Sequence, residues 1–158
     1  METETGTLWL TADEQRTWRI HLEVSKLLTH QLERDLQPFG LTYNDYEILV
    51  NLSESPEHRM RMSDLARATL QSKSRLSHQI SRMETAGLVR RENCESDRRG
   101  LFAVLTEDGW ETMRKVAPHH VVAVREHFID LLPAEDLAAL RKALHPVADH
   151  LRAVRGKA

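Results

Sequence analysis

Apolar residues recur at helical spacing over long stretches near both ends of the chain. The first stretch predicts an amphipathic helix from about Ala12 to Leu36. Thr11, followed by two acids, is typical of a helix start. Pro38 and Gly40 end the pattern, because neither residue continues a helix readily.

The C-terminal third predicts two more helices. One starts at Thr106 and runs to Leu132, with a kink rather than a stop at Pro118, because an internal proline removes only one hydrogen bond and crowds the preceding turn. The other opens at Pro133 and is expected to fray over the basic residues 152–158. Its apolar positions form a nearly heptad seam: Leu137, Leu140, Leu144, Val147 and Leu151.

Short elements lie between these long helices. Thr42 can cap a helix that reaches Leu52, and Arg61, between two methionines, suits a very short strand. Ser63 with Asp64 is then expected to cap the next helix.

A helix over 63–69, a second helix over 72–83 and two β-rich pieces follow in order. The β-rich pieces are 88–91 and 101–105, with a charged tip at 93–100 between them. Helix, turn, helix and hairpin is the order of a winged helix, in which the second helix enters the major groove of DNA.

The helix over 72–83 has only one narrow apolar stripe, formed by Leu76, Ile80 and Met83. The remaining side chains form hydrogen bonds. Short hydroxyls let a helix approach base edges and phosphates, and arginine can read guanine. We therefore expect DNA contacts from Ser72, Lys73, Ser74, Arg75, Ser77, His78, Gln79 and Arg82.

Basic residues are concentrated in the same part of the chain. The 158 residues carry a net charge of −2, but residues 59–99 contain ten Lys or Arg and five Asp or Glu, which gives +5 there and −7 elsewhere. A basic island on an acidic body favours an oriented contact with phosphates. Chance clustering on a solvated face is the alternative.

The pattern predicts a mainly α fold with a small β component (α+β), a winged helix-turn-helix with N- and C-terminal dimerisation helices. Residues 1–10 are expected to be flexible, 41–106 to bind DNA, and 11–40 with 107–158 to form the dimerisation region. The terminal helices carry more apolar surface than one small domain can cover, and a two-fold dimer would bury it. A monomer with an internal helical subdomain is the alternative.

Three segments together resemble the wing signature of the multiple-antibiotic-resistance regulator (MarR) family. They are Leu88-Val89-Arg90-Arg91, Ser96-Asp97-Arg98-Arg99-Gly100 and Val104-Leu105-Thr106-Glu107-Asp108-Gly109. Residues 41–52 and 62–66 also lie where that family has its second helix and the start of its helix-turn-helix. The likeness covers about residues 14–152.

The resemblance implies a homodimeric repressor that binds a pseudo-palindromic operator in double-stranded DNA and that a small anionic or phenolic molecule releases. It also implies that Arg98 or Arg99 at the wing probes the minor groove, where narrow A·T tracts attract guanidinium groups. Asp97 is expected to orient an arginine, because phosphates repel a carboxylate.

The resemblance further implies an effector pocket between the dimer helices and the DNA-binding lobe. On this chain such a pocket would have a mixed aromatic and polar wall, made of Trp18, His21, Ser25, Asp45, Tyr46, Trp110 and Met113. For each of these residues, packing in the core is the alternative role.

Redox or metal sensing by the same fold are alternative functions. Cys94 lies near Arg90 and Arg91, which would favour a reactive thiolate, and oxidation of the wing could block DNA binding. The nine histidines lack the i, i+4 spacing of a helical zinc pair, so we expect no metal site and no cofactor.

The chain has no sequence motif of an enzyme, such as a Gly-rich phosphate loop or a Cys-x-x-Cys pair. A winged helix that docks another protein is a second alternative, although it would not need a helix rich in hydroxyls and arginine. With one cysteine, no signal peptide and no membrane-length apolar run, the protein is expected to be cytoplasmic.

Overall fold

The structure is a computed structural model that describes residues 8–94 and 97–156. It divides into two compact units, the first extending to His120 and the second beginning at Val121. Residues 1–7 of the N-terminus that was expected to be flexible lie outside the described part.

Helix α1 (Ala12–Leu36) starts at the predicted residue because Thr11 forms a capping box with Glu14. The Glu14 N–H donates to Thr11 Oγ1 over 3.3 Å, and the Glu14 carboxylate accepts the Thr11 N–H over 2.7 Å. A short 3-10 helix (Gln37–Phe39) follows and ends at Gly40, whose left-handed backbone (φ 71°) turns the chain. Helix α2 (Tyr43–Glu54) then begins with its own capping box.

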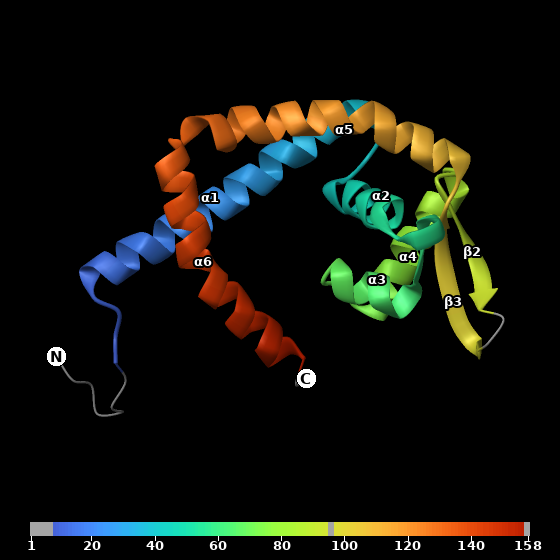
Figure 1. The fold of residues 1–158 in the computed structure, drawn as a ribbon, viewed down its shortest axis with the longest axis horizontal. Coiled ribbons are helices and arrows are strands. Elements are labelled where there is room, and N and C mark those ends of the chain that lie inside the picture. The colour runs from blue at the N-terminus through green and yellow to red at the C-terminus, as the bar shows by residue number, and fades with distance from the viewer. Residues whose placement is uncertain (1–7, 95–96, 157–158) are drawn as a thin grey trace. The chain divides into compact units, whose positions relative to one another are not determined.

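Helices α3 (Met62–Ala68) and α4 (Lys73–Thr85) form the predicted helix-turn-helix (Figure 1). The second helix was predicted to open at Ser72, and in the structure Ser72 is the N-cap of α4, one residue before the helix begins. The prediction that Ser63 and Asp64 cap α3 is wrong, because α3 begins at Met62 without a side-chain cap. The strand before it keeps Arg61 extended up to the first helical residue.

The wing is a three-stranded antiparallel sheet in the order β1-β3-β2, made of β1 (Arg59–Arg61), β2 (Val89–Cys94) and β3 (Asp97–Leu105). The predicted short strand at Arg61 therefore exists and pairs with Phe102. β2 and β3 are longer than predicted, because their pairing continues to Cys94 opposite Asp97. Most of the expected tip is thus strand.

Helix α5 (Glu107–His127) continues through Pro118, as predicted, and crosses the boundary between the units. It ends before Leu132, since Phe128 leaves the helical region (φ −147°, ψ −60°) and a 3-10 helix (Ile129–Leu131) follows. Helix α6 (Ala134–Arg155) extends into the residues that were expected to fray.

One apolar core holds the first unit together. It combines side chains of α2, α3, α4 and the sheet, and it includes Leu36 from the end of α1 and Val116 from α5. Ile48, Leu49 and Ile80 in it are fully buried. Burial of one such side chain contributes about 1.5–3 kcal/mol, so the core fixes the position of α4. In the second unit, α6 has no buried residue along its described length.

Candidate nucleic-acid interface

Helix α4 presents a row of exposed hydrogen-bonding side chains. Leu76, Ile80 and Met83 are buried beneath it and fix its rotation about its axis. The exposed members of the predicted set are Ser72, Lys73, Ser74, Arg75, Ser77, His78 and Arg82. Hydroxyls, a lysine and two arginines on one helical surface are the side chains that contact bases and phosphates.

Serine hydroxyls organise the first turn of α4. Ser72 Oγ accepts the backbone N–H of Arg75 over 3.3 Å and lies 3.3 Å from Ser74 Oγ. The remaining N–H groups of this turn are at the positive end of the helix dipole, next to Lys73 and Arg75. An anion such as a phosphate is therefore favoured at this end of the helix.

Gln79, predicted to contact DNA, is instead buried. It is 9% exposed, and its Nε2 donates to Asp45 Oδ1 over 3.0 Å. Arg82 donates to the same oxygen over 2.7 Å, and Asp45 Oδ2 accepts the Thr42 N–H over 2.9 Å. The buried carboxylate thus links the middle of α4 to the start of α2, and Gln79 serves that link.

Asp45→Asn should lower the free energy of unfolding by about 1–2 kcal/mol, because the amide loses the charge that faces Arg82 and one of the two acceptor oxygens. Urea unfolding followed by circular dichroism would measure the loss. Asp13→Asn is the control, since Asp13 forms an exposed ion pair with Arg16. That variant should change stability by less than about 0.5 kcal/mol. Equal losses in both variants would contradict a role for the buried carboxylate.

A hollow of about 740 Å³ is bordered by α1, α2 and α4. Its lining residues are Glu33, Thr42, Asn44, Gln71, Ser74, Arg75, His78, Gln79 and Arg82. Gln71 Nε2 is buried and has no hydrogen-bond partner among the described residues. With two arginines and several amide and hydroxyl groups against one carboxylate, the lining suits a small anion.

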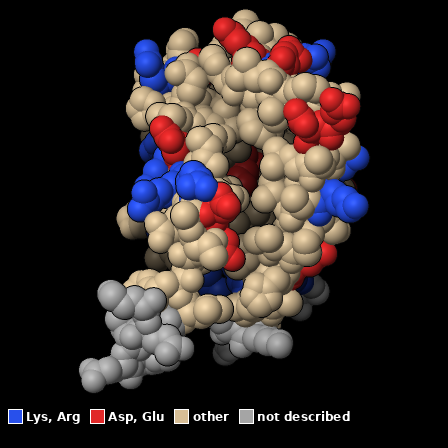
Figure 2. Space-filling view, turned by 90° about the vertical axis from the view of Figure 1, so that its left-hand side faces the viewer, with Lys and Arg blue, Asp and Glu red and all other residues tan. Residues whose placement is uncertain are grey.

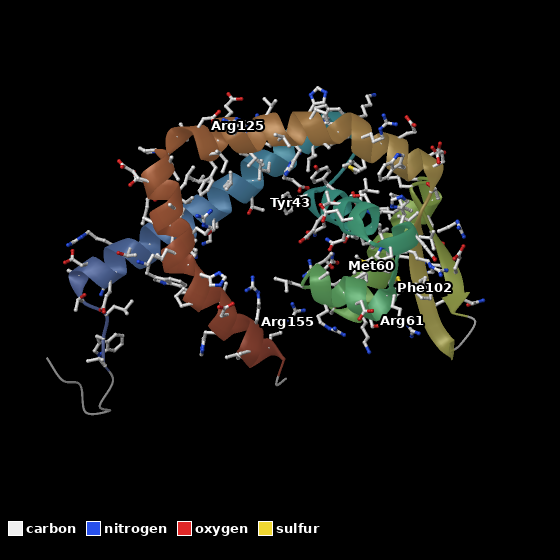
Figure 3. All side chains as sticks on the ribbon, in the orientation of Figure 1. Tyr43, Met60, Arg61, Phe102, Arg125 and Arg155 are labelled. Atoms are coloured by element: carbon white, nitrogen blue, oxygen red, sulfur yellow. The ribbon has the colours of Figure 1, made fainter. Side chains whose placement is uncertain are left out.

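A second hollow, of about 270 Å³, lies between α3, α4 and the wing. It is lined by Arg61, Met62, Ser63, Lys73, Leu76, Ser77, Arg91, Gly100 and Leu101. All charged residues of this lining are cations. Figure 3 shows Arg61 beside Phe102 of β3, where its guanidinium lies 5.6 Å from the ring centre.

The predicted wing contacts fall at the edge of the described part. Residues 97–99 belong to β3 by their backbone, but the side chains of Asp97, Arg98, Arg99 and Cys94 lie outside the described part. Their roles in DNA contact or redox chemistry stay predictions.

Three residues of the predicted effector pocket lie on α1. Trp18 and His21 stack with ring centres 5.9 Å apart, and both are exposed. Ser25 is also exposed, and its hydroxyl donates to the His21 carbonyl over 2.8 Å. Their spacing of three and four residues places these three side chains on one face of α1.

The other four predicted pocket residues are in different surroundings. Asp45 and Tyr46 are buried in α2. Trp110 packs on His58, with ring centres 4.7 Å apart, and Met113 packs against the core. The role of all seven residues in ligand binding stays a prediction. Packing was the alternative role, and these last four residues do pack against other parts of the first unit.

Sequence reasoning missed an aromatic cluster around His120. Its ring centre lies 4.3 Å from that of Tyr46 and 6.3 Å from that of Tyr43. Burial lowers the pKa of His120, opposed by the charge of Asp35, and burial raises the pKa of both tyrosines. His120 is therefore a neutral packing residue near pH 7. Its spacing from the buried Val116, i to i+4, was the available signal.

Within residues 8–94 and 97–156, no group of three His, Cys, Asp or Glu side chains could hold a metal ion. None of the described helices is long and apolar enough to cross a membrane.

Known proteins share this arrangement. A model of the MarR family matches residues 39–100. The crystal structure of AbsC, a MarR family transcriptional regulator from Streptomyces coelicolor, is 78% identical, with 93% of this chain and 99% of that chain covered and a TM-score of 0.90. Sco3205 from the same organism, a MarR family regulator in complex with DNA, is 44% identical, with 94% and 93% covered and a TM-score of 0.89. The regulator PecS of Dickeya dadantii is 28% identical over 81% of this chain and 77% of its own length.

Proposed function

Because this chain belongs to the MarR family of DNA-binding transcriptional regulators, we propose that it is a homodimeric repressor of a pseudo-palindromic operator, released from DNA by a small anionic or phenolic ligand. The exposed face of α4 carries the proposal. It joins hydroxyls, a lysine and two arginines on a helix that the core holds at the surface. Sco3205, with 44% identity, is a relative whose structure was solved in complex with DNA.

Exposed apolar side chains support the dimer. On α6 they are spaced i, i+3, i+7 and i+10, and so share one face: Leu144, Val147, Leu151 and Val154. On α1, the exposed apolar residues are Trp18, Ile20, Val24 and Leu27. Figure 2 shows that charged side chains of both signs are scattered among broad uncharged areas on the face it draws. Such apolar surface is typical of a protein interface, and a second copy of the chain is the proposed occupant.

The hollow of about 740 Å³ supports release by a ligand. Its volume is in the range of small-molecule sites, and Arg75, which has no carboxylate within ion-pair distance among the described residues, can neutralise a carboxylate or phenolate. A ligand bound there would contact Ser74, Arg75 and His78, which are also proposed to bind DNA. Ligand and DNA would then compete for the same side chains.

The direct test is a fluorescence-anisotropy titration with a labelled duplex from the region upstream of the protein's own gene. Binding should weaken by about 10³-fold between about 50 and 200 mM salt, because counterions are released from the phosphates. Sedimentation should show a dimer, and 4-hydroxybenzoate, which is anionic and phenolic, should weaken binding. Salt-independent binding or a sedimenting monomer would contradict the proposal.

A further inference from the structure

We propose that Arg91 is a positioning residue that fixes Ser77 of α4 as a hydrogen-bond donor toward bound DNA. The inference rests on the proposed DNA binding and adds a residue outside the predicted contact set. Arg91 belongs to β2 of the wing, so it links two elements that both approach DNA in a winged helix.

Glu84 holds Arg91 in place. Its carboxylate accepts the Arg91 backbone N–H over 2.8 Å and also pairs with the Arg91 guanidinium. The Arg91 side chain is 23% exposed and the Glu84 side chain is 32% exposed, so solvent screens the pair only in part. Glu84 lies near the C-terminal end of α4, where helix carbonyls disfavour a carboxylate, and the arginine offsets this.

From this anchor the guanidinium extends along α4. Arg91 Nη2 donates to the Ser77 carbonyl over 2.8 Å, to Ser77 Oγ over 3.2 Å and to Ser81 Oγ over 3.1 Å. Ser81 Oγ in turn donates its hydrogen to the Ser77 carbonyl over 3.0 Å. The Ser81 hydroxyl is thus both donor and acceptor within the protein.

The Ser77 hydroxyl keeps its own hydrogen available. A serine hydroxyl has one hydrogen and two lone pairs, and Arg91 occupies one of the lone pairs. Among the described residues, no acceptor for the Ser77 hydrogen is found, and Ser77 is exposed. The adjacent guanidinium repels a second donor and favours an acceptor.

The surroundings of Ser77 also favour its role as a hydrogen-bond donor. Ser77 and Arg91 line the hollow of about 270 Å³ together with Arg61 and Lys73. Its charged residues are all cations, so it attracts electron-rich groups. In DNA these are phosphate oxygens and the purine N7 or guanine O6 atoms. Arg91 thereby turns a serine that could accept or donate into a donor.

A double-mutant cycle on the full chain tests this. Arg91→Gln, Ser77→Ala and the double variant are titrated against the operator duplex and against a random duplex of equal length. Each single variant should weaken operator binding by about tenfold, as expected for one lost hydrogen bond, with a smaller loss on random DNA. The double variant should lose no more operator affinity than the single variant that binds more weakly, because both substitutions act through the Ser77 hydroxyl.

Arg90→Gln is the matched control. Arg90 precedes Arg91 in β2, is exposed and pairs with Glu92, so its substitution removes the same charge from the same strand. It should weaken binding to both duplexes equally. Additive losses in the cycle, or an Arg91→Gln variant that behaves like Arg90→Gln, would overturn the inference.

Glu84→Gln is a second test of the positioning role, and it does not depend on whether the Arg91→Gln variant folds. It releases the guanidinium while keeping the arginine, and it should also lower the ratio of operator to random affinity. An unchanged ratio would count against the positioning role. A wild-type protein that binds neither duplex would instead refute the proposed function itself.

Discussion

Gly109→Ala should lower the free energy of unfolding by about 3 kcal/mol, at the upper end of what overpacking costs. A Cβ atom at this position would lie 2.0 Å from the Leu88 carbonyl oxygen and 2.7 Å from Leu105 Cδ1. The same carbonyl accepts the Thr106 N–H over 3.1 Å, so it cannot move without breaking a hydrogen bond. The first turn of α5 would have to separate from the start of β2. Urea unfolding followed by circular dichroism measures the loss.

Gly156→Ala is the control for this variant. At Gly156 the nearest atom to an added Cβ is 3.6 Å away, which is ordinary contact. Its substitution should change stability by less than about 0.5 kcal/mol. If Gly109→Ala were equally harmless, the close approach of α5 and β2 would not exist in solution.

Arg75→Ala should weaken operator binding by about 1–3 kcal/mol, and most of the loss should fall on one base position. Arg75 is exposed in the first turn of α4, and among the described residues no carboxylate lies within ion-pair distance of it. A guanidinium without an acidic partner is available for a bidentate contact with guanine. Anisotropy titrations with operators altered at single positions would locate the base.

Two further variants distinguish a contact with a base from a charge contact with the phosphates. Lys73→Ala should weaken binding to all sequences alike and reduce the salt dependence by about one phosphate contact. Arg114→Ala, on α5 and paired with Glu111, should leave operator affinity unchanged. An Arg75→Ala variant that matched Lys73→Ala on every operator would contradict base reading by Arg75.

Local signals predicted the helices well. The caps at Thr11 and Ser72 each join residues only three positions apart, Thr11 with Glu14 and Ser72 with Arg75, so the local sequence carries the information for them. Two helix ends were predicted less well. The start of α3 depends on the pairing of β1 with a distant strand, and α5 ends where the backbone of Phe128 leaves the helical region. The alternation around Arg61 predicted the short strand, but it did not show that this strand runs directly into α3 at Met62.

The candidate site was predicted in its position but not in its internal contacts. Gln79 follows Leu76 by three residues and precedes Met83 by four, so helical spacing already placed it on the buried stripe. Its partner Asp45 comes from another helix, which the spacing could not reveal. Arg91 likewise follows the buried Val89 by two residues in β2. Side chains two residues apart in a strand lie on the same face, so the spacing already placed Arg91 on the inner face.

The short outer strand β1 has a consequence for behaviour at high concentration. Open strand edges recruit further strands and start aggregation. β1 offers only three residues, and its Arg59 and Arg61 lie over Phe102 at 4.9 and 5.6 Å from the ring centre. A foreign strand would meet few backbone partners and a charged border. Fibril growth from the β1 edge of the sheet is therefore disfavoured.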